Sequence, residues 1–519
     1  MSVIRSAAKV GGFTSISRVL GFIRDQLVAF TLGTGGVAEA FFVAQRFPNL
    51  FRTLFAEGAF NSAFVPLFAR KVEGEGERAA HRFARDVFSA LLAWVLLFTV
   101  IAIAAMPWLI YAIAPGFKGD PAKIALATLL TQICFPYLLF MSLTALQGGV
   151  LNSLHRFTAA AAAPILLNIV MILSNMLAYT LGSGNSPLTG YIFAVGVTLS
   201  GVAQYALLAV ACSRAGMPLT PRLPRLTPDV KLVIKRSVPG IISGGIMQIN
   251  LVIGTMIATS IPSAVAYLYY ADRLYQLPLG VIGVAIGVVL LPTLSRKLRA
   301  GDEWGALDAS NRAIEFSLFL TLPAAAALMV IGAPILHTVF EHGAFHAGDT
   351  LAVAPAVAAY AAGLPAYSLT KVFQPGFYAR EDTRTPMNFA IVSVVVNIVL
   401  SLALSRFMGH VGIALAATIA AWINAGQLYF RLRKLGHFTF DRSARFRLSR
   451  MILSTCIMAA ALFDVGLLMD GAFDPGAHIL RAIIGLALLV AAGIISYFGA
   501  SQLTGAWRLS ELRGALRRS

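Results

Sequence analysis

Long apolar runs separated by short polar or charged segments dominate the chain. Nearly every run reaches the roughly 20 residues that a helix needs to cross the hydrocarbon core of a bilayer. Boundaries at charged residues, Gly and Pro predict fourteen membrane-spanning helices. Their expected ranges are 10–32, 38–69, 87–110, 124–151, 159–181, 190–212, 237–259, 264–294, 313–338, 351–378, 386–405, 412–430, 451–469 and 482–504.

The composition agrees with this pattern. Hydrophobic residues make up 58% of the 519 positions, charged residues make up only 12%, and the mean hydropathy is +0.77. A soluble domain has too little interior to bury so much apolar side chain. The sequence therefore predicts an all-α polytopic membrane protein with 14 transmembrane helices.

The distribution of Lys and Arg predicts the orientation, because basic loops resist translocation across the membrane. With a cytoplasmic N-terminus, the inside segments hold 31 of the 41 Lys and Arg residues, and the outside loops hold four. We therefore expect both termini in the cytoplasm. The formal net charge of +18 then belongs to the cytoplasmic face and gives no reason to expect nucleic-acid binding.

An internal repeat predicts how the helices are grouped. Ala44-Gln45-Arg46 is echoed by Ala271-Asp272-Arg273, and Phe135-Pro136 by Leu364-Pro365, at a spacing of about 227 residues. We expect two parallel six-helix lobes around a central cavity, plus two extra C-terminal helices. The expected segments are an N-lobe (1–213), a basic linker (214–236), a C-lobe (237–440), helices 13 and 14 (441–506), and a basic tail (507–519).

Six basic residues fall inside the expected spans: Arg18, Arg24, Arg46, Arg52, Arg273 and Lys371. A cation at the bilayer centre costs roughly 2.5–3.5 kcal/mol even on a lenient scale, so such side chains normally face a protein-lined cavity. Four acidic residues share these spans: Asp25, Glu39, Glu57 and Asp272. Internal pairing, such as Arg24 with Asp25 or Glu39 and Arg52 with Glu57, is one interpretation. The excess of bases favours a missing anion.

Arginine suits a diphosphate, because its planar guanidinium presents paired donors to phosphate oxygens. Our hypothesis is that Arg18, Arg24, Arg52 and Arg273 bind such a group, with Arg46 and Lys371 as secondary cavity residues. Glu39 and Glu57 would bond to arginines and close the opposite end of the cavity in an alternating-access cycle, with Asp25 and Asp272 as further ion-pair candidates.

The sequence also resembles a known family. The matching segments are Ser17–Asp25, Ala40–Ala44, Pro48–Arg52, Phe55–Phe60, Phe64–Pro66, Tyr270–Leu274, Lys371–Arg380 and Thr385–Pro386. In combination they resemble the MurJ (MviN) family, the bacterial lipid II flippases of the multidrug/oligosaccharidyl-lipid/polysaccharide exporter superfamily. The similarity covers the first twelve expected helices.

The resemblance implies that lipid II is moved from the cytoplasmic to the periplasmic leaflet of the bacterial inner membrane. It further implies that the arginines at positions 18, 24, 52 and 273 line the central cavity, and that the last two helices form a groove for the polyprenyl tail. Implied partners are lipid II, membrane lipids and other proteins of cell-wall synthesis. The only cofactor implied is a sodium ion, for which Asp382 and Asn397 are the candidates.

Other functions are less well supported by the residues. We find no nucleotide-binding, metalloprotease or nucleophile motif that would indicate an enzyme. A drug or cation antiporter of the same superfamily would be expected to carry acidic rather than basic residues in its cavity. A flippase for another polyprenyl-diphosphate-linked oligosaccharide stays open, because it handles the same diphosphate. A purely structural membrane protein would leave the arginines within the spans without a purpose.

Overall fold

Helices are the only regular elements in the part of the chain that the structure describes. The computed structural model describes residues 3–53, 59–474 and 478–506, and these form α-helices and two short 3-10 helices. The predicted all-α class is thereby confirmed. The chain divides into two compact units, Met1–Ala266 with His342–Phe345, and Tyr267–Glu341 with His346–Ser519.

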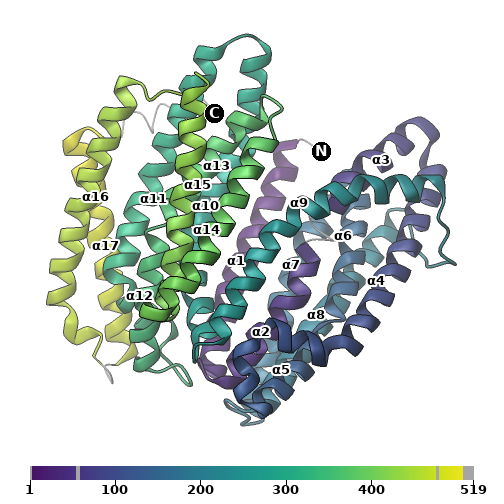
Figure 1. Ribbon diagram of the computed structural model, residues 1–519, viewed down its shortest axis with the longest axis horizontal. Coiled ribbons are helices and arrows are strands. Elements are labelled where there is room, and N and C mark those ends of the chain that lie inside the picture. Colours follow the sequence, from purple (N-terminus) through teal and green to yellow (C-terminus); the bar gives the residue numbers. More distant parts are fainter. Residues whose placement is uncertain (1–2, 54–58, 475–477, 507–519) are drawn as a thin grey trace. The chain divides into compact units, whose positions relative to one another are not determined.

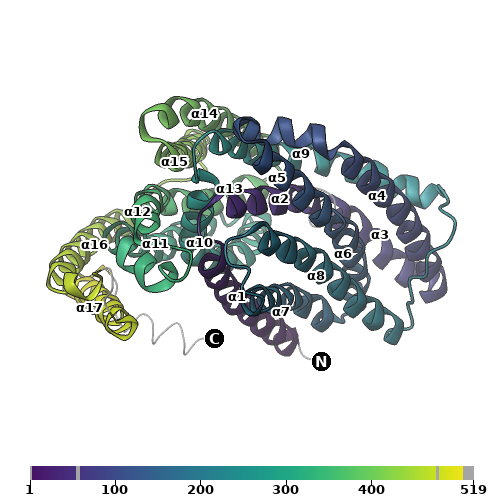
Figure 2. The same ribbon diagram turned by 90° about the horizontal axis from the view of Figure 1, so that it is seen from below.

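The first unit contains the helices up to α9 (Figure 1). They are α1 (Val3–Leu32), α2 (Gly36–Arg52), α3 (Ala59–Glu75), α4 (Glu77–Ile113), η2 (Pro115–Gly119), α5 (Pro121–Cys134), α6 (Tyr137–Ser153), α7 (Phe157–Thr180), α8 (Pro187–Arg214) and α9 (Pro228–Thr259). Helix α1 packs against α7, and α7 packs against α8. Helix α9 lies along α3 and α4, as the end-on view of Figure 2 shows.

The second unit contains the remaining helices, apart from the first residues of α10. They are α10 (Ala264–Arg299), α11 (Glu303–Phe340), α12 (Ala347–Ala361), α13 (Leu364–Tyr378), α14 (Arg384–Met408), α15 (His410–Lys434), α16 (Arg442–Leu468), η3 (Asp470–Ala472) and α17 (Ile479–Thr504). Helices α16 and α17 lie side by side and both pack against α11 (Figure 2).

The border between the units differs from the border that the repeat suggests. Val230 and Val233 of α9 are buried in the same apolar core as Phe64 and Phe83, so α9 belongs by contact to the first unit. The repeat reflects sequence similarity, whereas contacts reflect packing, so a difference between the two borders does not test the repeat. The expected segments 1–213, 214–236, 237–440 and 441–506 stay a prediction. The expected tail, 507–519, lies outside the described residues.

Ten helical segments among the described residues are long and apolar enough to cross a membrane. The other four expected spans correspond to α1, to α2 with α3, to α9 and to α10. Three of these four contain the intramembrane charges other than Lys371, and these charges lower their mean hydropathy. Trp108, Leu467 and Leu503 are more than half exposed, as is usual for side chains that face lipid. The protein is a multi-pass membrane protein, and the total of fourteen spans stays a prediction.

Two of the ten spans are interrupted at matching places in the repeat. Helices α5 and α6 meet at Phe135-Pro136, and α12 and α13 meet just before Leu364-Pro365. Proline has no backbone N–H and its ring crowds the preceding turn, so it disrupts a continuous helix. The motif that revealed the repeat thus marks a break in each half of the chain.

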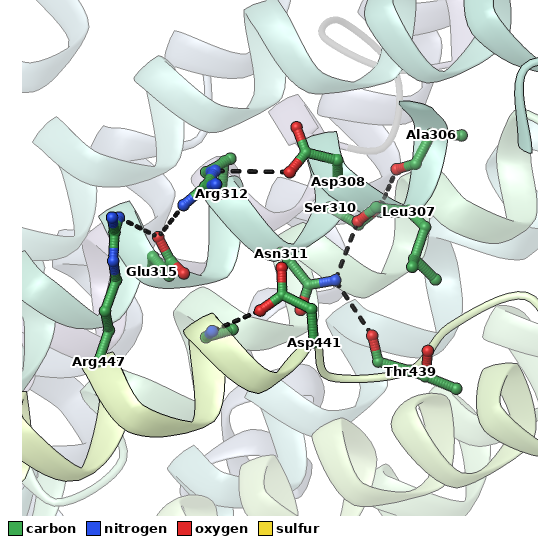
Figure 3. A network of polar contacts seen from close by, with 11 residues as sticks. Ala306, Leu307, Asp308, Ser310, Asn311, Arg312, Glu315, Thr439, Asp441 and Arg447 are labelled. Carbon is green, nitrogen blue, oxygen red and sulfur yellow. Dashed lines mark hydrogen bonds and ion pairs between the residues drawn. The ribbon is translucent and has the colours of Figure 1, made fainter. Parts of the chain in front are cut away.

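A polar network joins α11 to α16 in the second unit (Figure 3). The buried Glu315 carboxylate accepts hydrogen bonds from Arg312 Nη1 at 3.0 Å and from Arg447 Nη1 at 3.1 Å. Asn311 donates to the carbonyl of Thr439 at 3.1 Å, in the segment that leads into α16. These bonds fix the start of α16 on α11, because a buried carboxylate needs such donors to offset its lost hydration.

A short segment, His342–Phe345, rests on the end of α1 within the first unit. The amide of Ala344 donates to the carbonyl of Phe30 at 2.8 Å. A Cβ on Gly343 would lie 2.3 Å from that same oxygen, and a Cβ on Gly33 would lie 2.2 Å from the carbonyl oxygen of Ala344. Both glycines have positive φ values, so this approach depends on glycine for space and for conformation.

We expect Gly343→Ala to lower the thermal stability of the protein more than Gly436→Ala does. The φ values are +64° and +73°, so both alanines bear the cost of a positive φ, about 1–2 kcal/mol. Only at position 343 would the new Cβ also meet a backbone oxygen, whereas nothing lies within 4 Å at position 436. Thermal unfolding of the purified variants in detergent measures the difference. Equal losses would contradict the close packing of this segment on α1.

Candidate functional site

Helix α1 carries two of the predicted arginines. Arg18 is exposed, Arg24 is partly buried, and the neighbouring Asp25 is 4% exposed. Six residues of helix separate the two arginines by about 9 Å along the axis and by about 120° around it, so they face different directions. Arg24 Nη2 lies 2.7 Å from Asp25 Oδ1, which is the internal pair that the sequence suggested as one interpretation.

Arg24 is also held by α7. Its Nη1 donates to Asn168 Oδ1 at 3.0 Å, and Asn168 Nδ2 donates in turn to the carbonyl of Ser17 at 2.8 Å. The amide of Asn168 is therefore oriented by the α1 backbone, with its oxygen toward the guanidinium. Gly21 lies next to this amide, and a Cβ there would be in ordinary van der Waals contact with Asn168 Oδ1 at 3.6 Å. The sequence analysis did not assign Asn168 to the site, although Asn397 follows it after 229 residues, close to the spacing of the repeat.

Of the two arginines of α2, one contacts another helix and the other contacts a residue of its own helix. Arg46 Nη1 donates to Thr255 Oγ1 of α9 at 2.8 Å, so this side chain links α2 to α9. Arg52 Nε donates to Asn49 Oδ1, one turn earlier in the same helix, at 2.8 Å. The expected partner of Arg52, Glu57, lies outside the described residues, and its pairing stays a prediction.

Glu39 differs from the expectation of an arginine partner. It is 2% exposed near the start of α2, and its carboxylate forms an ion pair with Lys123 Nζ of α5. The same ammonium lies 4.1 Å from the centroid of the Phe117 ring. Burial makes such a pair depend on both partners, since either charge alone would be costly to desolvate. Sequence reasoning treated Lys123 only as a charge of an outside loop, and nothing local in the sequence indicates its partner.

Arg273 and Asp272 lie in the second unit, on α10. Arg273 Nη2 donates to the hydroxyl of Tyr269 at 3.2 Å, and its guanidinium carbon lies 4.6 Å from the centroid of the Tyr269 ring. Asp272 accepts a hydrogen bond from Gln276, one turn later. Both side chains are partly buried. The tyrosine therefore orients Arg273 without neutralising its charge.

The remaining candidates, Lys371, Asp382 and Asn397, lie apart along the second unit. Lys371 is exposed on α13. Asp382 Oδ1 accepts from the amide of Thr385 at 3.0 Å at the start of α14, and this bond is the main reason that the pKa of Asp382 is below its usual value. Asn397 lies about 20 Å further along the same helix, since a helix rises about 1.5 Å per residue. A single sodium ion cannot bind to both residues.

Metal ligation has little support elsewhere. No group of three or more His, Cys, Asp or Glu side chains comes together as a metal site within the described ranges 3–53, 59–474 and 478–506. The basic residues of the candidate site, apart from Lys371, are arginines. Arg24 has a carboxylate neighbour, and Arg46, Arg52 and Arg273 each donate to an uncharged oxygen, which helps to orient the guanidinium group.

Comparison with known proteins gives the family. The family model described as lipid II flippase MurJ matches residues 28–484. A protein of Rhizobium tropici, named as a probable lipid II flippase MurJ, is 44% identical over 522 residues, which cover 100% of this chain and 97% of the relative. A protein of Rhizobium meliloti (strain 1021) with the same name is 46% identical over 520 residues, with the same coverage of both chains.

Solved structures agree with this result. A lipid II flippase MurJ in an inward closed conformation matches with a TM-score of 0.77 and 25% identity, and the match covers 95% of this chain and 98% of the other. An inward-facing multidrug resistance MATE family transporter of the MOP superfamily matches in fold, with a TM-score of 0.67, 16% identity and coverage of 81% and 95%. With full-length relatives and a family model over most of its residues, this chain belongs to the lipid II flippase MurJ family.

Proposed function

We propose that this protein moves lipid II from the cytoplasmic to the periplasmic leaflet of the bacterial inner membrane. The observation that carries the proposal is the 44% and 46% identity to lipid II flippases along the whole chain. A flippase is a transporter, so no covalent change of the substrate is involved. The apolar spans supply the membrane setting that such a lipid substrate requires.

We propose that the diphosphate of lipid II is bound by the guanidinium groups of Arg18, Arg24, Arg52 and Arg273. Arginine presents its donors in a fixed plane that matches two phosphate oxygens at once. The bond from Arg24 to Asn168 and the contact of Arg273 with Tyr269 support the proposal, because they hold these two guanidinium groups in defined orientations. Arg46 and Lys371 act as secondary contacts.

Alternating access requires that the substrate bind the two states with different affinity. We propose that Asp25, Glu39, Glu57 and Asp272 take part in ion pairs that differ between these states. The buried bond between Glu39 and Lys123 joins α2 to α5 and is the best-defined candidate for a pair that breaks and reforms. The excess of basic residues in the inside segments supports cytoplasmic termini, which place this pair at the periplasmic end.

The last two helices supply a candidate path for the polyprenyl tail. Helices α16 and α17 pack against α11 and present exposed apolar side chains along their length, among them Ile452, Leu453, Ile494 and Ile495. An apolar lipid-facing surface of this kind suits an isoprenoid chain, which stays within the hydrocarbon layer while the headgroup crosses. Other proteins of cell-wall synthesis are proposed as partners on the strength of the substrate alone.

We expect Arg18→Ala, Arg24→Ala, Arg52→Ala and Arg273→Ala each to reduce lipid II translocation by about 10- to 100-fold. The loss of one charged hydrogen-bonding group costs about 1.5–3 kcal/mol. Depletion of the native protein and complementation with each variant, scored by the periplasmic accessibility of lipid II, measures the effect. Arg406→Ala, in an expected outside loop, serves as the matched control.

Lysine variants at the same four positions separate charge from geometry. We expect them to remain well below the parent protein, because an ammonium cannot reproduce the planar fork. Alanine variants that insert normally and still support full translocation would contradict the binding assignment. Translocation of a different polyprenyl-diphosphate-linked oligosaccharide in place of lipid II would favour the alternative, a flippase for that other lipid.

We also propose a sodium requirement, with Asp382 and Asn397 as separate candidates because they lie too far apart to share one ion. Asp382→Asn keeps an oxygen that can cap α14 and removes the charge, since Asn and Asp cap helices equally well. We expect this variant to fold normally and to lose the stimulation of transport by sodium over choline in proteoliposomes. Undiminished stimulation in both Asp382→Asn and Asn397→Ala would exclude these two residues as ligands.

A further inference from the structure

A cavity of about 390 Å³ opens at one end of the second unit, and none of the arginines already discussed lines it. Its polar lining consists of His337, Glu341, Thr350 and Asp470. It lies where α11 and α16 end and where α12 begins. Since these helices belong to three of the apolar spans, the cavity is expected at the boundary between membrane and water. Its volume falls in the range of small-ligand sites.

The carboxylate of Glu341 is fixed within this cavity. Its Oε2 accepts a hydrogen bond from Thr350 Oγ1 at 2.5 Å and lies 3.1 Å from His337 Nδ1. Both contacts use the same oxygen atom. An ionised carboxylate has about four acceptor positions on its two oxygens, so Glu341 retains the capacity to accept further hydrogen bonds.

Other features of the wall also favour a positively charged ligand. Asp470, at the start of η3, adds a second carboxylate, and the described lining residues include no Lys or Arg. Val330 and Pro334 both line the cavity, and Pro334 has no N–H to offer the carbonyl of Val330, so this carbonyl lacks its usual helix bond. The end of a helix also carries partial negative charge, which applies here to α11.

The mouth of the cavity is apolar. Leu351, Phe463 and Leu467 line it and are 74%, 59% and 63% exposed. In a membrane protein such side chains contact lipid rather than water. A ligand that fills the acidic interior and also covers this mouth must combine a cationic group with hydrocarbon chains.

We propose that this cavity binds the headgroup of a phospholipid that ends in a primary ammonium group, such as phosphatidylethanolamine, with its acyl chains along α16. A primary ammonium has three N–H donors, which suit the carboxylates of Glu341 and Asp470 and a backbone carbonyl. A trimethylated headgroup has no N–H to donate, and an anionic headgroup is repelled by the two acids. The same repulsion excludes the diphosphate of the transported lipid, so this site is separate from the arginine site.

Native mass spectrometry of the full-length protein in detergent tests the proposal. The probes are phosphatidylethanolamine, phosphatidylcholine and phosphatidylglycerol with identical acyl chains. We expect the ethanolamine lipid to bind about tenfold more tightly than either of the others. Glu341→Gln and Asp470→Asn should each reduce this preference several-fold. Asp464→Asn removes an exposed acid of α16 that does not line the cavity, and should leave the preference unchanged.

Asp470 is exposed, so Asp470→Asn is not expected to impair folding. This variant therefore tests the proposal even if Glu341→Gln fails to fold. Equal binding of the ethanolamine and choline lipids would overturn the proposal. Preferential binding of the glycerol lipid, or a full ethanolamine preference in a folded Asp470→Asn variant, would overturn it as well.

Discussion

The cost of placing a cation in hydrocarbon is the constraint on which the rest of this structure depends. An arginine inside a membrane span needs polar partners, water or an anion, because the bilayer offers no hydration. The structure meets this need in the first unit with the Arg24, Asp25 and Asn168 cluster and with the bond from Arg46 to Thr255. Of the four helices that carry these residues, only α7 is among the ten long apolar segments. In the proposed function, these arginines meet an anionic headgroup that arrives with a lipid.

The acidic residues have several different roles that the sequence does not distinguish. Asp25 neighbours an arginine, Glu39 forms a buried pair with Lys123, and Glu315 joins α11 to α16 through two arginines. Only the first of these partners is adjacent in sequence. Removing one member of a buried pair leaves an uncompensated charge, so a pair between two helices, such as Glu39 with Lys123 or Glu315 with Arg447, holds those helices together while it is formed. Glu341 differs, because its neighbours are a threonine and a histidine and it faces a cavity.

Much of the fold was predictable because a membrane span has a simple length and composition requirement. The Phe135-Pro136 and Leu364-Pro365 echoes even predicted equivalent positions, which the structure shows as breaks between helices. Long-range partners were not predictable. Lys123 lies 84 positions from Glu39, and Asn168 lies 144 positions from Arg24, so no local periodicity connects them. The placement of α9 with α3 and α4 was also missed, because a repeat indicates similarity and not packing.

The central claim is that guanidinium groups within the membrane recognise the diphosphate of a lipid-linked substrate. Transport by the purified protein in proteoliposomes tests it most directly, with fluorescent lipid II compared with an analogue in which an uncharged linker replaces the diphosphate. The account predicts that lipid II crosses the bilayer and that the uncharged analogue, although it keeps the same sugar, peptide and tail, crosses no faster than in protein-free vesicles. Equal protein-dependent rates for the two lipids would contradict the account.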